Sequence, residues 1–195
     1  MISFREILKD DAQKLLAWRL QPHVARWMLT QVDNDLSRQQ AWIEKIRTAD
    51  DTYHWIIQLG GTDVAYMKIE GYSPAQAMAE MGFYVGEAGY APLAVGFLHA
   101  CYAALFRHFE LEAILGSIFE GNTILKIHEH SGYEPDKERK PALMEGNPPQ
   151  KLLPYILRRE VFLQKHPPKD VPDLPVTLWK GRNLPSPAHM ETCYN

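Results

Sequence analysis

The sequence has little cysteine, no long apolar run and no excess of positive charge. Its two cysteines, Cys101 and Cys193, match neither a disulfide framework nor a metal-ligand pattern, so we expect no bound metal. No continuous stretch of about 18 apolar residues occurs, which argues against a membrane span. The net charge of −3 argues against a nucleic-acid partner, because surfaces that bind phosphate backbones are normally basic.

Two nucleotide-binding fingerprints are also missing. No Gly-x-Gly-x-x-Gly run is present, and no Gly-Lys-Ser/Thr follows a glycine-rich loop, which excludes the Rossmann fingerprint and the Walker loop. The chain starts directly with a strand-like segment instead of an apolar leader, so we expect a cytoplasmic protein. With 46% hydrophobic and 23% charged residues, the composition is that of a globular domain and not of a disordered or fibrous chain.

The hydrophobic periodicity predicts an α+β domain. A strand-like segment at 2–8 precedes helical patterns at 10–18 and 37–46, the second with a capping-box pattern formed by Ser37 and Gln40. Further strands are expected at 53–59, 62–70, 78–85, 112–119, from 133 onward and at 152–162, where the second half also fits a helix. Helices are expected at 92–109, beginning with Pro92, and at 122–131, ending at Gly132. This order predicts a mixed sheet flanked by helices.

The most informative unit is the strand, glycine loop and helix at 79–109. A helix N-terminus exposes unpaired backbone N–H groups, and a glycine such as Gly89 lets the backbone approach an anion closely. The unit is therefore a candidate phosphate or pyrophosphate cradle. An ordinary turn before a core helix is the alternative interpretation.

Several segments resemble the GNAT superfamily of acyl-CoA-dependent N-acetyltransferases. The run Gly89-Tyr90-Ala91-Pro92-Leu93-Ala94 is similar to the Gly-Tyr-Ala-x-x-Ala run of the branch that acetylates ribosomal-protein N-termini. Residues 79–86 resemble the fourth strand of the family, and Asn122, a helix and Gly132-Tyr133 resemble its Asn-helix-Gly-Phe signature, one residue short. The run 18–28 and residues 40–43 resemble a branch that acetylates nucleotide-linked amino sugars in pseudaminic-acid synthesis. Two positions depart from the family loop: Gly86 replaces Gln or Arg, and Glu87 adds a negative charge.

The resemblance implies a fold and a co-substrate. The fold is a GNAT-like mixed, mostly antiparallel central sheet flanked by helices and splayed between its fourth and fifth strands. The co-substrate is acetyl-CoA, whose pantetheine arm lies in the splay and pairs with the fourth strand as an added strand would. The implied contacts are the backbone of Phe83, Tyr84 and Val85 for the pantetheine, the amides of Gly89, Tyr90, Ala91 and Leu93 for the pyrophosphate, and Asn122 as a further cofactor-binding residue.

Transfer of an acetyl group to an amine needs a base, because an alkylammonium is mostly protonated at neutral pH. Glu80 is the candidate base, since a charged residue inside an apolar strand is uncommon; a surface ion pair is the alternative interpretation. His128 is the candidate acid, because it falls where many family members carry the acid tyrosine; an exposed helix histidine is the alternative. The backbone N–H of Tyr84 or Val85 is the candidate donor to the oxyanion.

The acceptor pocket of such a protein is built from the first two helices and the late strands. The candidate acceptor-binding residues are Trp18, Arg19, Trp27 and Met28, although both tryptophans also fit a plain core. We expect direct transfer in a ternary complex, since Cys101 lies in an apolar helical run and is expected to be buried. The expected acceptor is the amine of an amino sugar or of a nucleotide-linked amino sugar. A protein N-terminal acetyltransferase and a non-catalytic CoA- or ligand-binding module are the alternatives.

Proline is distributed unevenly along the chain. Eleven of the 14 prolines lie at or beyond Pro135. The family-like body covers 1–162, and 163–195 form a proline-rich extension in which long regular elements are not expected. Its Leu178, Trp179 and Tyr194 favour packing on the body or on a second copy of the chain, in which case the protein is a homodimer.

Overall fold

The computed structural model describes residues 1–109, 111–145 and 149–167. Within these ranges the chain forms one mixed sheet in the order β1-β2-β3-β4-β5-β8-β6, with β7 also beside β8. The β4–β5 pair is parallel, and every other described strand pair is antiparallel. The strands are β1 (Ile2–Glu6), β2 (Tyr53–Leu59), β3 (Thr62–Ser73), β4 (Met78–Val85), β5 (Ala113–Phe119), β6 (Glu134–Pro135), β7 (Ala142–Met144) and β8 (Gln150–Arg158).

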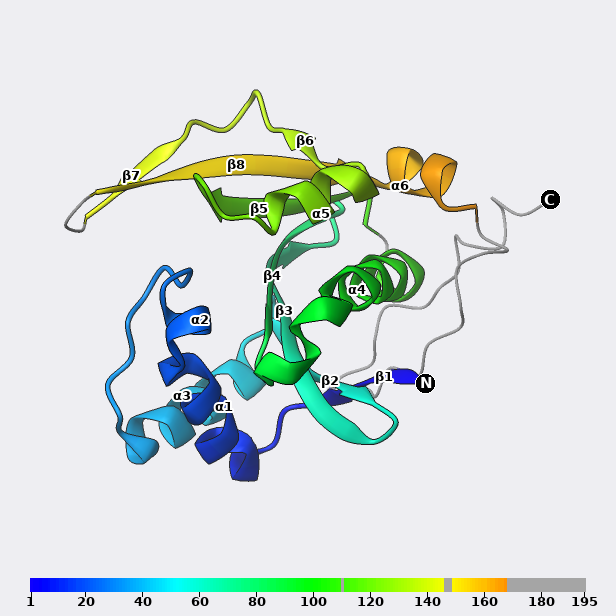
Figure 1. Ribbon diagram of the computed structural model, residues 1–195. Helices are drawn as coiled ribbons and strands as arrows, with labels where there is room; N and C mark the ends of the chain where they lie inside the picture. The colour runs from blue at the N-terminus through cyan, green and yellow to red at the C-terminus, as the bar shows by residue number, and fades with distance from the viewer. Residues whose placement is uncertain (110, 146–148, 168–195) are drawn as a thin grey trace.

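The helices lie on both sides of this sheet (Figure 1). In that view α1, α2 and α3 lie on one side of β4, and α4 lies on the other, below α5 and α6. The α-helices are α1 (Ala12–Leu20), α2 (Pro22–Ala25), α3 (Leu36–Thr48), α4 (Ala94–His108), α5 (Leu125–Ser131) and α6 (Arg159–Lys165), and the 3-10 helices are η1 (Lys9–Asp11) and η2 (Ala88–Leu93). The α+β class and the mostly antiparallel sheet are therefore confirmed.

The sheet opens between β4 and β5. These two strands pair only through Met78–Glu80 on β4 and Ala113–Leu115 on β5. Beyond Glu80, β4 stays paired with β3, while β5 pairs with β8 along its whole length. The edge of β4 from Met81 to Val85 consequently has no strand partner on its β5 side, and the predicted splay is confirmed.

Helix α4 is the main core helix behind this opening. Ten of its residues are buried, among them Phe97, Leu98, Tyr102 and Phe106. The continuous helical stretch Ala88–His108 is long and apolar enough to cross a membrane, which corrects our expectation that no such segment exists. Because 56% of its most apolar part is buried inside the protein, the stretch has the properties of a core helix.

Two local predictions differ from the structure, and the structure decides between the two alternatives of a third. Helix α3 begins at Leu36 and is capped by Asp35, whose Oδ1 accepts the N–H of Arg38 at 3.0 Å, so the expected capping box at Ser37 is not used. The expected loop before α4 is the 3-10 helix η2, which contains Pro92, and α4 itself begins at Ala94. The second half of 152–162 is helical, as the alternative for that segment allowed.

The proline-rich extension falls largely outside the described residues. Helix α6 runs past residue 162 to Lys165, and 168–195 are not described. Leu178, Trp179, Cys193 and Tyr194 belong to that part of the chain, so the packing of the extension and the homodimer stay predictions.

Gly86, directly after β4, lies against the indole of Trp18 on α1. A Cβ at Gly86 would come within 2.0 Å of Trp18 Cδ2. Trp18 is only 2% exposed, and its Nε1–H donates to the Glu87 carboxylate at 2.8 Å, which leaves the ring little freedom to move. The position therefore accepts only glycine without a rearrangement of α1.

We predict that Gly86→Ala lowers the free energy of unfolding by about 1–3 kcal/mol, the usual cost of overpacking a filled site. Gly89→Ala is the matched control, since a Cβ there meets nothing within 4 Å, and its effect should stay within about 0.5 kcal/mol. Urea unfolding of the two variants measures the difference. Equal urea midpoints for the two variants would show that the Trp18 side chain can move aside at little cost in stability.

Candidate active site

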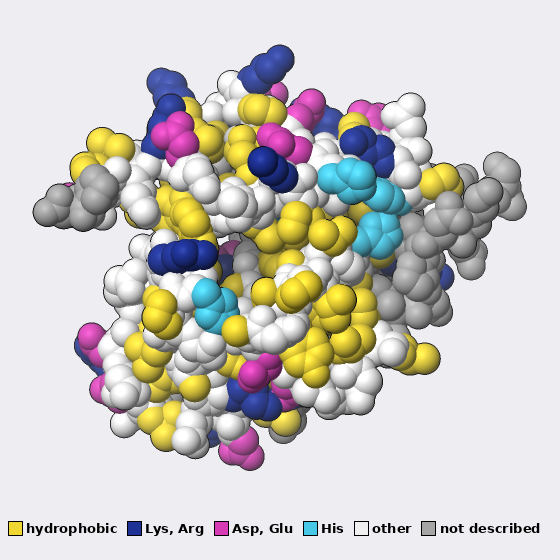
Figure 2. Space-filling model, in the orientation of Figure 1, with side chains coloured by type: hydrophobic (Ala, Val, Ile, Leu, Met, Phe, Trp, Pro, Cys, Tyr) yellow, Lys and Arg dark blue, Asp and Glu magenta, His cyan; other side chains and the backbone are white. Residues whose placement is uncertain are grey.

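A cavity of about 970 Å³ lies in the opening between β4 and β5. Its walls come from α1, α2, the segment between α2 and α3, α3, β3, β4, β5 and α5, with one residue each from η2 and α4. Figure 2 shows the molecule hollowed between its two halves, with hydrophobic side chains along the hollow. Segments far apart in the sequence therefore share one site.

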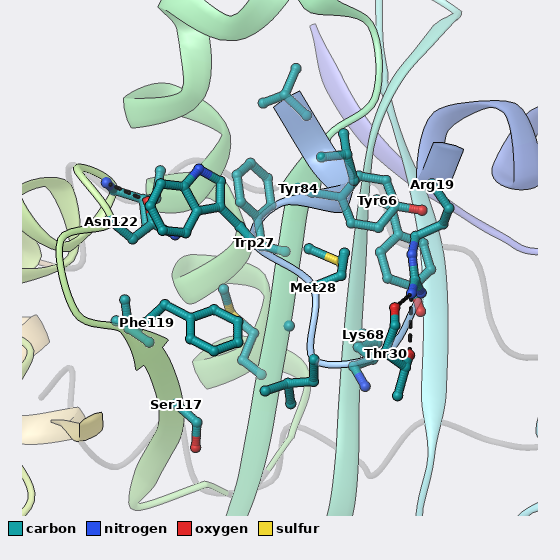
Figure 3. A pocket seen from close by; sticks show the side chains of 18 of the residues that line it. Arg19, Trp27, Met28, Thr30, Tyr66, Lys68, Tyr84, Ser117, Phe119 and Asn122 are labelled. Carbon is teal, nitrogen blue, oxygen red and sulfur yellow. Dashed lines mark hydrogen bonds between the residues drawn. The ribbon is translucent and has the colours of Figure 1, made fainter. Parts of the chain in front are cut away.

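The cavity gathers most of the residues expected from the sequence (Figure 3). Trp18 does not line it and belongs to a core cluster with Leu15 and Tyr84. Gly89, Tyr90 and Leu93 lie outside its lining, on η2. The expected residues that do line it are Arg19, Trp27, Met28, Glu80, Phe83, Tyr84, Val85, Ala91, Asn122 and His128.

Glu80 stands at the point where the strands separate. It is the last residue of β4 that pairs with β5, opposite Leu115, and its side chain is half-exposed. Arg139 Nη1 lies 3.8 Å from the Glu80 carboxylate. Arg139 is itself held by Asp136, with an Nε–Oδ2 distance of 2.7 Å, and donates to the carbonyl of Gly116. A carboxylate in this position can accept a proton from a group in the opening.

His128 is buried, in contrast to the alternative of an exposed helix histidine. Burial lowers the pKa of its imidazole to about 4, because the low-dielectric surroundings disfavour the cation, so His128 is neutral at neutral pH. The hydroxyl of Tyr102 on α4 is hydrogen-bonded to its Nδ1, and the ring of Tyr133 stands edge-on at 5.0 Å.

A second histidine–tyrosine pair lies behind the β3–β4 wall. His54 Nδ1 is 2.6 Å from the hydroxyl of Tyr66, and burial lowers the pKa of His54 to about 3. The ring of Tyr66 stacks on that of Tyr84 at 4.7 Å, and both rings line the cavity. Burial raises the pKa of both tyrosines, so this wall carries neutral aromatic groups.

Arg19 of α1, Arg38 of α3 and Lys68 of β3 are the cationic side chains of the described lining, and Arg38 and Lys68 are paired with carboxylates. Arg19 differs from both. Its Nη2 donates to the backbone oxygen of Thr30 at 2.7 Å and to Thr30 Oγ1, while its buried Nε has no partner. In the part of the chain that the structure describes, no carboxylate lies within ion-pair distance of Arg19.

The four acidic residues of the lining have partners: Asp33 pairs with Arg38, Asp35 accepts the Arg38 N–H, Glu70 pairs with Lys68, and Glu80 lies near Arg139.

The other half of the opening fits an extended ligand that ends in an anion. The free β4 edge offers backbone groups, although the Val85 carbonyl already accepts the Nε2–H of His23 at 3.3 Å. Helix η2 is exposed, and neither η2 nor α4 has a side-chain cap, which favours an anion at these helix starts. The Tyr90 N–H, one of the expected pyrophosphate contacts, already donates to the Glu87 carbonyl at 2.9 Å. Asn122 accepts the Ile124 N–H at 3.1 Å through its side-chain oxygen, which leaves its amide nitrogen available.

Sequence reasoning missed several residues of this site. In the sequence, Tyr102 lies in the apolar stripe of a helical segment, and Arg139 forms a short basic pair with Lys140. Tyr66 was an ordinary member of an alternating strand. Tyr66 lines the cavity, whereas Tyr102 and Arg139 lie behind the lining and contact His128 and Glu80. No signal in the sequence marks these residues, because their place at the site depends on contacts with distant segments.

Comparison with known proteins places this geometry in a family. Residues 2–134 match the acetyltransferase (GNAT) domain. No curated protein sequence matches the chain significantly.

Solved structures with the same fold include three with informative titles. The aminoglycoside acetyltransferase AAC(6')-Ib in complex with coenzyme A has a TM-score of 0.68 and 15% identity over 84% of this chain and 98% of that chain. The spermidine N-acetyltransferase from Vibrio cholerae in complex with CoA and spermine has a TM-score of 0.72 and 9% identity, covering 83% and 98%. Mycobacterium smegmatis RimJ in complex with CoA-disulfide has a TM-score of 0.68 and 17% identity, covering 82% of each chain.

The family match covers more than half of the chain and agrees with the splayed sheet. The GNAT resemblance and the acetyl-CoA co-substrate that it implies are thereby confirmed, whereas neither of the two branches is. The chain belongs to the GNAT acetyltransferase family and is an acetyl-CoA-dependent N-acetyltransferase.

Proposed function

We propose that the protein acetylates the primary amine of an amino sugar that carries a phosphate group, as a nucleotide-linked amino sugar does. The observation that carries this proposal is the charge of Arg19, which no carboxylate of the described residues balances. A guanidinium binds phosphate through paired hydrogen bonds and stays charged at any relevant pH.

The aromatic residues of the acceptor half support the same class of acceptor. Trp27 and Met28 follow α2 and line the cavity with Tyr66 and Tyr84 (Figure 3). Aromatic faces of this kind stack on nucleotide bases and on sugar rings. The titles of the structural neighbours name aminoglycoside and spermidine acetyltransferases, so this fold accommodates amine acceptors of different chemistry.

The proposed reaction uses residues from both sides of the opening. Glu80 accepts the proton of the acceptor ammonium, directly or through water. The amine nitrogen then attacks the thioester carbonyl, and an N–H of the β4 edge near Tyr84 or Val85 donates to the oxyanion. The carbon–sulfur bond breaks, the electron pair passes to the sulfur, and His128 faces the leaving thiolate.

The burial of the Cys101 thiol supports direct transfer in a ternary complex. This thiol is wholly buried in α4, and burial raises its pKa well above the usual value. A thiolate is the nucleophilic form, so Cys101 is not suited to carry an acetyl group between two substrates.

An acceptor screen that follows the release of free CoA thiol tests this function. We expect kcat/KM for a nucleotide-linked amino sugar to exceed that for the same free amino sugar by about 10-fold or more, the size of a charged hydrogen bond. Preference for a peptide N-terminus would instead favour the protein acetyltransferase alternative. Failure to bind acetyl-CoA in calorimetry would favour the non-catalytic module.

We predict that Arg19→Met raises the KM for a phosphate-bearing acceptor by about 10- to 100-fold, the cost of one charged contact, and leaves the KM for acetyl-CoA unchanged. Arg158→Gln is the control, since this arginine lies on β8 outside the cavity and pairs with Glu134 at 3.6 Å. Steady-state kinetics with both substrates varied provide the measurement. An equal rise in KM for phosphorylated and unphosphorylated acceptors would show that Arg19 does not bind the phosphate group.

We predict that Glu80→Gln lowers kcat by about 100-fold, as expected when a general base is lost, with little change in acetyl-CoA binding. Glu44→Gln, on the surface of α3 and paired only with Lys9, is the matched control and should behave like the wild type. Turnover and calorimetry on the same preparations separate chemistry from binding. An unchanged kcat in Glu80→Gln would show that Glu80 is not the general base.

A further inference from the structure

We propose that Tyr102 is a positioning residue: its hydroxyl donates to His128 Nδ1 and keeps the imidazole in the tautomer whose proton is on Nε2, toward the reactants. This inference rests on the proposed reaction, in which His128 faces the leaving sulfur. It assigns a role to a residue of α4 that approaches the reacting groups only through the histidine.

The direction of this hydrogen bond follows from burial. Tyr102 is completely buried, and His128 Nδ1 is the acceptor that its hydroxyl reaches among the described residues. If the histidine were the donor, the Tyr102 proton would be buried without an acceptor, which costs about 1–3 kcal/mol. Burial also raises the pKa of Tyr102 well above its usual value, so the hydroxyl keeps its proton.

The protonation of His128 then follows. The groups that face it are Tyr102 from α4 and Tyr133 after α5, both neutral, and within the described ranges no carboxylate forms an ion pair with it. Its pKa of about 4 makes the ring neutral at neutral pH, with one proton on one nitrogen. Because Nδ1 accepts from Tyr102, that proton is on Nε2, and Nε2 is the nitrogen left for the cavity.

This arrangement defines what His128 contributes. A neutral imidazole is too weak an acid to give up its proton near neutral pH, but its N–H is a good hydrogen-bond donor. As the amide carbon–nitrogen bond forms and the carbon–sulfur bond breaks, Nε2–H donates a hydrogen bond to the thiolate and keeps its proton. Glu80 passes the ammonium proton, which it accepted before the attack, to solvent and then accepts the second proton that the nitrogen releases as the amide forms. The thiolate is protonated later from solvent.

Nitrogen-15 NMR of the imidazole in the full-length protein tests the inference. In the wild type at pH 7 we expect Nε2 to carry the proton and Nδ1 to be unprotonated, and in Tyr102→Phe we expect a mixture of both tautomers. Tyr133→Phe is the matched control: it removes a neighbouring hydroxyl with no hydrogen bond to His128, so the wild-type tautomer should persist. A proton on Nδ1 in the wild type, or an unchanged tautomer in Tyr102→Phe, would overturn the proposal.

Kinetics supply the second readout. We expect Tyr102→Phe to lower kcat by about 10-fold with an unchanged KM for acetyl-CoA, since only the reacting state loses an oriented donor. If Tyr102 acts through His128, the same substitution should have no further effect in a His128→Ala background. Additive losses would show a general structural role.

Different measurements test the role of Tyr102 and the proposed acceptor class, so either proposal can be overturned without the other. The NMR measurement needs no acceptor, so an unexpected tautomer overturns the role of Tyr102 whatever the acceptor is. Absence of acetyl transfer with a correct tautomer overturns the proposed acceptor class instead. If Tyr102→Phe does not fold, the tautomer of wild-type His128 alone decides.

Discussion

The early end of the β4–β5 pairing is the constraint on which the rest of the molecule depends. After Glu80 the two strands follow different partners, β3 on one side and β8 on the other. Backbone groups on the free β4 edge need hydrogen-bond partners. His23 supplies one to the Val85 carbonyl, and water or a bound molecule can supply others. The core around α4 lies behind the opening, so the cavity is held open by packed side chains, and a ligand finds its partner strand already in place.

The walls of the opening separate neutral from charged groups. Two buried histidines, His128 in the lining and His54 behind it, are hydrogen-bonded to tyrosines and kept neutral by burial, His54 with Tyr66 and His128 with Tyr102. The charges face the opening at different places, with the Glu80 carboxylate at the splay point and the Arg19 guanidinium beside the segment that contains Thr30. An acceptor with an amine at one end and an anion at the other therefore has only one favourable orientation.

Much of this fold could be predicted because its elements have clear local signals. The period changes from helical to alternating at the start of β2, Gly132 adopts the left-handed conformation that ends α5, and the order of elements leads to a mixed sheet. The splay between β4 and β5 was expected from the resemblance to the GNAT family. Details that were predicted wrongly depend on which of two neighbouring side chains makes a hydrogen bond. At the start of α3, for example, Asp35 and not Ser37 caps the helix. Site residues such as Tyr102 and Arg139 could not be predicted, since their side chains meet partners 26 and 23 positions away. Such contacts are set by register and packing, which a linear pattern does not contain.

The contact between Gly86 and Trp18 has a consequence for how this sequence can change over time. The glycine that departs from the family loop and the tryptophan that fills its place are mutually dependent. Glutamine or arginine at position 86 becomes tolerable only after Trp18 has been replaced by a smaller residue. That replacement alone would leave a hole in α1 and free the Glu87 carboxylate. The two positions are therefore expected to show sign epistasis, because either change alone weakens the packing that the two changes together can restore.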